Sequence, residues 1–276
     1  MGVIKTPLRY PNGKQREAEG IVSKFPSNTK EIRDIMCGGG SISFKSREMF
    51  PEAKIWMNDA NSDLINFLEK ASYDNKEMIM MVIKWMGEYK GKDLFKFCKD
   101  KLMQEKLKVL DANHLEMATA FYIINRLAYS GTLNGGYTEY NYHNRLTFNN
   151  MTRLETLDGF IRRNWMVTNE SWEHIIDAPS KFNDNEVLIF ANPPYYNDSM
   201  QMYYKSVNHG NQFPYKLLAD KLATTKYKFL VVMDDSRFIR DTFSFANIIS
   251  KSTLDGNNDI RKNKVISRDL LYITNY

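Results

Sequence analysis

Short apolar runs, each bounded by polar or glycine-rich segments, occur in the first and last thirds of the chain. Residues 187–190 form the clearest example, an unbroken apolar run typical of a strand buried in a parallel sheet. Segments with apolar residues at helical spacing separate several of these runs, and this alternation predicts an α/β fold. The expected strands are residues 32–36, 54–58, 164–169, 187–190, 228–233, 247–251 and 269–276.

Helices are expected where apolar residues recur every three or four positions. Ser41 marks the start of one helix, with Phe44 and Met49 facing inward. Asn61 is a good N-cap for another, because its side-chain oxygen can accept a backbone N–H of the first turn. The remaining helical features are an apolar face of Leu64, Ile65 and Leu68 and two expected helices at residues 15–24 and 214–224.

The pattern changes at about residue 72. Three long amphipathic stretches follow with no strand between them: residues 77–89, 93–110 and 114–129. Residues 130–150 are polar and rich in glycine and asparagine, which indicates a loop, and residues 151–163 again have helical spacing. We therefore expect one α/β domain interrupted by a mostly helical insertion, with boundaries at residues 1–71 and 164–276 for the former and 72–163 for the latter.

The composition of the 276-residue chain is that of a globular protein with a modest excess of positive charge. Hydrophobic residues make up 43%, enough for a large core, and no apolar run is long enough for a transmembrane helix. The net charge of +5 favours a polyanionic partner, although many enzymes are mildly basic. Two cysteines and four histidines make neither a disulfide framework nor a structural zinc site. We expect a cytoplasmic protein that needs no metal.

The segment Asn192-Pro193-Pro194-Tyr195 directly follows the apolar run at 187–190. Two prolines cannot continue the hydrogen-bond ladder, so the chain must leave the sheet there in a stiff turn. Open α/β sheets place their ligands at such carboxyl ends of strands. Asparagine offers an amide oxygen and tyrosine a flat face, a set that suits a planar amine. An ordinary proline turn is the alternative for this motif alone.

A glycine loop, Cys37-Gly38-Gly39-Gly40, follows another expected strand and precedes a helix. Glycines let the backbone approach a ligand closely, and a helix start offers free N–H groups. Asp59 follows Gly40 by 19 residues, a spacing that suits a carboxylate binding ribose hydroxyls. The loop matches neither a dinucleotide fingerprint nor a nucleoside triphosphate loop. S-adenosylmethionine, an adenosyl ligand without phosphates, is the expected cofactor; a glycine-rich connection without a ligand is the alternative.

Three motifs now lie in order: Pro-Leu-Arg-Tyr-Pro-Asn-Gly-Lys at 7–14, Met-Cys-Gly-Gly-Gly-Ser at 36–41 and Asn-Pro-Pro-Tyr at 192–195. With them the sequence resembles, from end to end, the Dam-like family of S-adenosylmethionine-dependent DNA adenine methyltransferases. The resemblance implies a Rossmann-like methyltransferase sheet flanked by helices, formed by residues 1–71 and 164–276. It also implies that the helical insertion, residues 72–163, is a target-recognition domain that binds DNA.

The resemblance implies roles for individual residues. The cofactor would be bound by Tyr10, Lys14, Cys37, Gly38 and Gly40 at its methionine end, by Asp59 at its ribose and by Trp172 at its adenine ring, with Asn192 also beside it. The target base would be held by Asn192, Pro193 and Tyr195. DNA contacts would come from Arg126, Thr132, Asn134, Tyr137 and Arg145.

The implied reaction is methylation of the exocyclic amino group of an adenine flipped out of double-stranded DNA. Asn192 and the carbonyl of Pro193 would each accept one N–H of the amine, and Tyr195 would stack on the base. The expected setting is a bacterial cytoplasm, with the gene belonging to a restriction–modification system or a phage.

Three positions depart from the usual family pattern. Asn12 replaces a glycine, Ser171 stands where an acid commonly meets the cofactor adenine, and Asn192 replaces an aspartate. Two alternatives therefore stay open: a DNA-binding homologue that has lost catalysis, and an amino-methyltransferase acting on cytosine in DNA, on RNA or on protein glutamine. A nicotinamide-dependent oxidoreductase is disfavoured, because its fingerprint is absent.

Overall fold

The computed structural model describes residues 5–10, 13–108, 113–162, 164–196, 212–254 and 267–276. Their contacts divide the chain into two compact units. The first unit comprises residues 1–24 and 37–170, and the second comprises residues 25–36 and 171–276. Asn12, one of the three unusual positions, lies outside the described residues. Among the residues described, no helix is both long and apolar enough to cross a bilayer.

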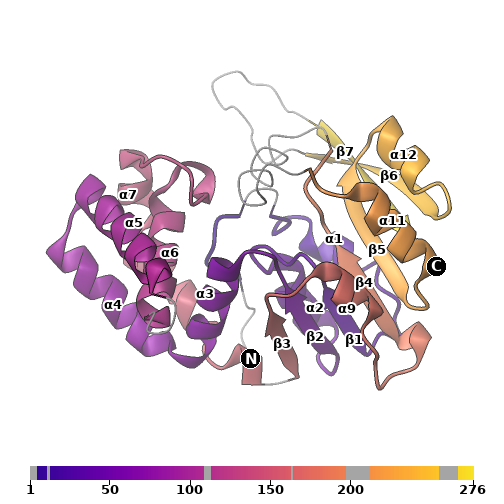
Figure 1. Ribbon diagram of the computed structural model, residues 1–276, viewed down its shortest axis with the longest axis horizontal. Helices are drawn as coiled ribbons and strands as arrows, with labels where there is room; N and C mark the ends of the chain where they lie inside the picture. The colour runs from indigo at the N-terminus through magenta and orange to yellow at the C-terminus, as the bar shows by residue number, and fades with distance from the viewer. Residues whose placement is uncertain (1–4, 11–12, 109–112, 163, 197–211, 255–266) are drawn as a thin grey trace. The chain divides into compact units, whose positions relative to one another are not determined.

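Seven strands form a mixed sheet in the hydrogen-bonding order β3-β2-β1-β4-β5-β7-β6 (Figure 1). In the first unit, β2 and β3 are parallel. In the second unit, β4 is parallel to both β1 and β5, whereas β7 pairs antiparallel with β5 and β6. This sheet with its helices confirms the predicted α/β class. The strands are β1 (Glu31–Asp34), β2 (Lys54–Asn58), β3 (Trp165–Thr168), β4 (Val187–Ala191), β5 (Lys228–Asp234), β6 (Asn247–Leu254) and β7 (Ser267–Thr274).

The strand β4 is buried along its whole length. Its two parallel neighbours within the second unit cover both edges, which explains why its sequence is an unbroken apolar run. Its last residue, Ala191, pairs with Val231 of β5, and the chain then enters the two prolines. The predicted stiff turn therefore does begin at the carboxyl end of a buried parallel strand.

The helices of the first unit pack around α6, in which residues 118–127 are all buried. Helices α4, α5 and α7 contact α6 (Figure 1). The predicted N-cap of α3 is confirmed, because Asn61 Oδ1 accepts the N–H groups of Asp63 and Leu64 at 3.1 and 3.3 Å. The helices are α1 (Ala18–Val22), α2 (Ser41–Met49), α3 (Ser62–Tyr73), α4 (Asn75–Glu88), α5 (Gly91–Leu107), α6 (His114–Leu127), η1 (Tyr129–Gly131), α7 (Glu139–Arg145), α8 (Phe148–Glu155) and η2 (Phe160–Arg162).

The second unit has short helices beside its five strands. Helix α11 contacts both α9 and α12. The expected helix at residues 214–224 is confirmed as α11, whereas α9 and α12 were not predicted. The helices are α9 (Trp172–Asp177), η3 (Asp184–Glu186), α11 (Tyr215–Thr224) and α12 (Arg237–Thr242).

Two local predictions were wrong. The polar segment at residues 130–150 is not a loop, because it contains α7 and the start of α8. Thr138 and Thr147 cap these helices: their hydroxyls accept the N–H groups of Asn141 and Asn150 at 3.2 and 3.3 Å. Met49 was expected to face inward, but it is exposed at the last position of α2.

Candidate active site

The glycine loop, residues 37–40, forms a tight turn in the first unit. Gly38 and Gly40 have φ angles of +50° and +77°, which residues with a side chain rarely adopt. The N–H of Gly40 donates to the carbonyl of Cys37 at 2.9 Å. A Cβ added at Gly40 would lie 2.8 Å from the ring of Phe44. Glycine is therefore required here both by the backbone angle and by the neighbouring ring.

Asp59 binds this loop directly. Its Oδ2 accepts the N–H of Gly38 at 2.9 Å, and its Oδ1 accepts the N–H of Asn61 at 2.9 Å. Burial raises the pKa of Asp59 above its ordinary value, while these two hydrogen bonds oppose the rise. Each carboxylate oxygen has a second lone pair, so Asp59 keeps acceptors for two ligand hydroxyls. The structure thus brings the predicted carboxylate and the glycine loop together.

The ring of Tyr10 covers the same loop. A Cβ added at Gly38 would lie 2.9 Å from two carbons of this ring, so Gly38 also admits the ring of Tyr10. Lys14 and Cys37 are buried in the same unit. The backbone N–H of Cys37 donates to the carbonyl of Asn58 at 2.8 Å, which ties the loop to the end of β2.

The ends of β2 and β3 are joined by side chains that the sequence did not single out. Asn58 Oδ1 accepts the Thr168 hydroxyl at 2.8 Å and the N–H of Glu170 at 2.9 Å. Asn169 Nδ2 donates to the carbonyl of Asp59 at 2.8 Å. These bonds fix the backbone on both sides of the Asp59 side chain. Polar residues at the end of an apolar strand were the only sequence signal for them.

These features fit an adenosyl cofactor. Gly38 and Gly40 leave bare backbone beside the loop, Asp59 supplies acceptors for ribose, and Tyr10 supplies an aromatic face. Within the described ranges there is no group of three or more histidine, cysteine or acidic side chains placed to hold a metal ion.

The acceptor turn lies in the second unit and holds an unsatisfied polar atom. Asn192 Oδ1 is buried, yet no donor in the described part of the chain lies within hydrogen-bonding distance. Leaving a buried acceptor without a partner costs about 1–3 kcal/mol. Such atoms are rare in folded proteins, and each calls for a physical explanation. A donor supplied by a ligand is one such explanation.

Hydrogen bonds hold the turn on both sides of Asn192-Pro193. The hydroxyl of Tyr215 donates to the carbonyl of Pro194 at 2.7 Å. The backbone N–H of Tyr196 donates to Asp234 Oδ1, at the end of β5, at 2.8 Å. The turn is therefore fixed to the carboxyl end of the neighbouring strand as well as to its own.

The two tyrosines after the prolines lie in different environments. Tyr195 is only 1% exposed, whereas Tyr196 is 39% exposed. The ring of Tyr196 stacks on Phe238, with centroids 4.3 Å apart and an interplanar angle of 18°. Tyr215 meets the Tyr196 ring edge-on at 5.7 Å. In this structure the predicted stacking ring of Tyr195 is packed inside the unit, and its neighbour carries the accessible face.

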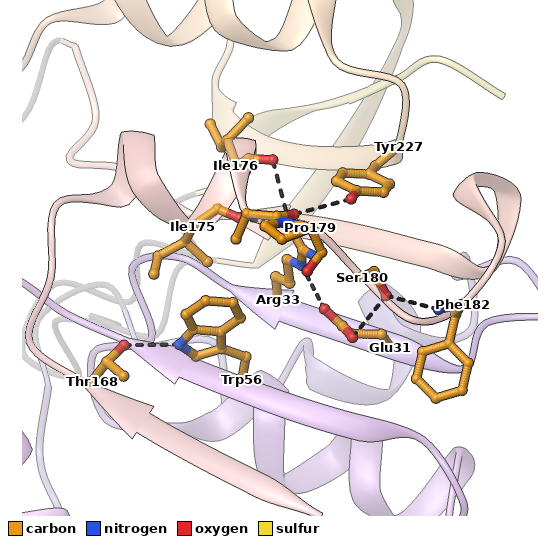
Figure 2. A network of polar contacts seen from close by, with 11 residues as sticks. Glu31, Arg33, Trp56, Thr168, Ile175, Ile176, Pro179, Ser180, Phe182 and Tyr227 are labelled. Atoms are coloured by element: carbon orange, nitrogen blue, oxygen red, sulfur yellow. Dashed lines mark hydrogen bonds and ion pairs between the residues drawn. The ribbon is translucent and has the colours of Figure 1, made fainter.

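Trp172, predicted beside the cofactor adenine, is the first residue of α9. It is half-buried, and its ring centroid lies 6.1 Å from that of Phe213. Arg33 of β1 fixes the other end of this helix: its Nη1 donates to the carbonyls of Ile175 and Ala178 at 2.8 and 2.7 Å (Figure 2). A cation at a helix C-terminus is favoured by the helix dipole.

The guanidinium of Arg33 is fully buried, and so is its partner Glu31. Arg33 Nε donates to Glu31 Oε1 at 2.7 Å, and the hydroxyl of Ser180 donates to Glu31 Oε2 at 3.0 Å (Figure 2). The guanidinium also lies 4.5 Å from the ring centroid of Tyr227. Every lone pair and charge in this network has a partner nearby, which offsets the cost of burying it.

Arg126, a predicted DNA-binding residue, is only 3% exposed. Its Nε donates to the carbonyl of Arg145 at 2.7 Å and its Nη1 to the carbonyl of Pro7 at 3.0 Å. Burial, with smaller contributions from nearby arginines, lowers the pKa of Arg126 to about 10. In this arrangement Arg126 fixes the N-terminal segment to the helices of the first unit, and contacting DNA would require it to leave these partners.

The other predicted DNA-binding residues lie between α6 and the end of α7. Arg145 and Asn134 are exposed, and Thr132 is half-buried. The hydroxyl of Tyr137 donates to Glu139 at 2.6 Å, and its ring lies 5.8 Å from that of Phe95. Arg145 is thus the accessible cation of the predicted set.

A family model described as D12 class N6 adenine-specific DNA methyltransferase matches residues 10–256. The chain belongs to this family. The match confirms the predicted family and enzyme class, and with them S-adenosylmethionine as the cofactor. A search of curated proteins finds no match.

Solved structures resemble this D12-class chain only in general fold. An S-adenosylmethionine-dependent methyltransferase from Agrobacterium tumefaciens has 8% identity and a TM-score of 0.41; the alignment covers 94% of this chain but 59% of that protein. The Methanobacterium thermoautotrophicum precorrin 8W decarboxylase has 9% identity and a TM-score of 0.38, covering 97% and 93% of the two chains. The Geobacter metallireducens precorrin-6y C5,15-methyltransferase has 9% identity and a TM-score of 0.37, covering 96% and 91%. Likeness at this level gives no information about substrate.

Proposed function

We propose that this D12-class chain transfers a methyl group to the exocyclic amino group of an adenine that has been flipped out of double-stranded DNA. The observation that carries the proposal is the buried Asn192 Oδ1, which lacks a donor among the described residues. An amine N–H of the target base would satisfy it. The stiff turn after β4 would hold this acceptor in place before the base arrives.

The amino nitrogen of adenine is a poor nucleophile, because its lone pair is drawn into the ring. Asn192 Oδ1 and the carbonyl of Pro193 would each accept one N–H and leave the lone pair directed at the methyl group. Positioning of this kind supplies on the order of 7–11 kcal/mol in the best cases. A neutral amide is a weaker acceptor than a carboxylate, but burying it costs less.

S-adenosylmethionine, when bound, supplies the electrophilic methyl group. Asp59 would accept its ribose hydroxyls, and Gly38 and Gly40 would admit it close to the backbone. Tyr10, Lys14 and Cys37 would line its methionine end, and Trp172 its adenine ring. No group of this chain needs to form a covalent bond with the substrate.

We propose further that residues 72–163 form an inserted domain that binds the DNA. The exposed Arg145 would contact phosphate or a base edge, with Thr132, Asn134 and Tyr137 nearby, while Arg126 would act through the segment that it fixes. The target amine is buried in a duplex, so the base must leave the stack. Such a substrate would place the reaction in the cytoplasm of a bacterium, on host or phage DNA.

Replacing Asn192 by alanine tests this proposal. Transfer of labelled methyl groups to unmethylated DNA should fall by about 10²- to 10³-fold, the loss typical when one preorganised catalytic hydrogen bond is removed. Cofactor affinity, measured by calorimetry, should be unchanged. The control is Asn185→Ala, an exposed asparagine before the other end of β4, which should retain full activity. Full activity in Asn192→Ala would refute the role of the amide.

A further inference from the structure

We propose that Tyr196, supported by Phe238, is the aromatic surface on which an unpaired base of the DNA substrate stacks. The inference rests on the proposed function and names the residue that receives the base. It begins from accessibility: Tyr196 is 39% exposed, whereas the Tyr195 ring is 1% exposed. Stacking requires one open ring face, and of these two tyrosines only Tyr196 presents an accessible ring.

The ring of Tyr196 is held rigidly. Phe238 stacks on one of its faces at 4.3 Å, and Tyr215 meets it edge-on at 5.7 Å. Its backbone N–H is fixed to Asp234 at 2.8 Å. Phe238 is itself placed by α12, whose N-cap Ser236 accepts the N–H of Ile239 at 3.3 Å. A ring that is already ordered loses little entropy when a base stacks on it.

The position of Tyr196 in the turn supports the same role. Only four positions separate it from Asn192, and two of the intervening residues are prolines that restrict the backbone. Both ends of this turn are fixed to the carboxyl ends of parallel strands. An amine bound by Asn192 therefore belongs to a base in the neighbourhood of the Tyr196 ring.

A cation accompanies the ring. Arg237 precedes Phe238 on α12, and its side chain is 95% exposed. Its contact with Asp241 is 3.6 Å long and also exposed, so that ion pair contributes little and leaves Arg237 available for a phosphate. Aromatic rings beside exposed cations are the combination by which proteins bind unpaired nucleotides.

The experiment measures binding of a single-stranded oligonucleotide that contains 2-aminopurine, whose fluorescence is quenched when it stacks. Tyr196→Leu should raise the dissociation constant by about 5- to 150-fold and reduce the quenching, as expected when one base–aromatic stack is lost. Tyr196→Phe, which keeps the ring, should behave like the original protein. The matched control is Tyr276→Leu, because Tyr276 is also 39% exposed and lies in the same unit.

A second variant protects the test against misfolding. Phe238→Leu leaves Tyr196 in place but removes its support, and it should weaken binding less than Tyr196→Leu does. Unchanged binding by a folded Tyr196→Leu protein would overturn the inference. So would an equal loss in Tyr276→Leu, or a loss confined to Tyr195→Leu.

Methyl transfer by the unmodified protein is measured in parallel, so that the two ideas can fail separately. Absence of transfer refutes the proposed function but leaves the fluorescence result as a test of stacking. Normal transfer together with unchanged binding by Tyr196→Leu refutes the stacking role alone.

Discussion

Asn192 and Asp59 lie at the carboxyl ends of two strands and hold opposite kinds of acceptor. Asn192 Oδ1 is a neutral oxygen with no donor among the described residues. Asp59 is a carboxylate that already accepts two backbone N–H groups, from Gly38 and Asn61. The first suits an amine that must keep its lone pair free, and the second suits hydroxyls that only need to be oriented.

Asp59 makes cofactor binding depend on pH. Its pKa is raised by burial, and a bound ribose would favour the ionised carboxylate. Affinity for S-adenosylmethionine should therefore increase as pH rises through this raised pKa and then level off. Calorimetric titrations between about pH 4 and pH 8, a range that begins near the ordinary pKa of aspartate, measure it.

The control for this dependence is Asp59→Asn, which should bind the cofactor more weakly and lose the pH dependence attributed to this group. The same shift has a consequence for folding. Because the folded state holds this proton more tightly than the unfolded state, the contribution of Asp59 to stability falls as pH rises through the same window. An affinity that is flat with pH in the unmodified protein would contradict this account.

At the scale of elements, the short helix α9 depends on a buried ion pair. Arg33 on β1 reaches the carbonyls at the end of α9, and Glu31 neutralises it at 2.7 Å (Figure 2). A six-residue helix has little stability of its own, so these contacts and its packing against α11 determine its position. The position of Trp172 at its first residue follows from them.

Replacing Arg33 by methionine should lower the free energy of unfolding by about 3–5 kcal/mol, because Glu31 would be left as an unpaired buried charge. Denaturant unfolding measures the change. The control is Lys30→Met: Lys30 forms a partly exposed ion pair with Glu186, and its loss should cost at most about 1 kcal/mol. Equal effects of the two substitutions would contradict the role given to the network.

The sequence predicted the elements better than the contacts between them. The apolar run of β4 and the Asn61 cap are local patterns, and both are confirmed. Helix α7 was missed because asparagine and glycine are typical of loops, although Thr138 was a usable cap signal. The stacking of Tyr196 on Phe238 joins distant parts of the chain, and no pattern in a single sequence marks such a pair.

At the scale of the molecule, the candidate residues are divided between two units. The first contains the glycine loop, Asp59 and the exposed Arg145; the second contains the Asn192 turn and the aromatic pair of Tyr196 and Phe238. The proposed reaction uses all of them, so neither unit contains enough chemistry for methyl transfer to DNA. The family match, which spans residues 10–256, likewise covers both units.

The most direct test of the central claim is expression of the full chain in a bacterium that lacks DNA methylation, followed by single-molecule sequencing of its genome. We expect N6-methyladenine at one recurring sequence motif and none in cells that express Asn192→Ala. An unmodified genome in the presence of folded, expressed protein, or methylation of cytosine in place of adenine, would contradict the account.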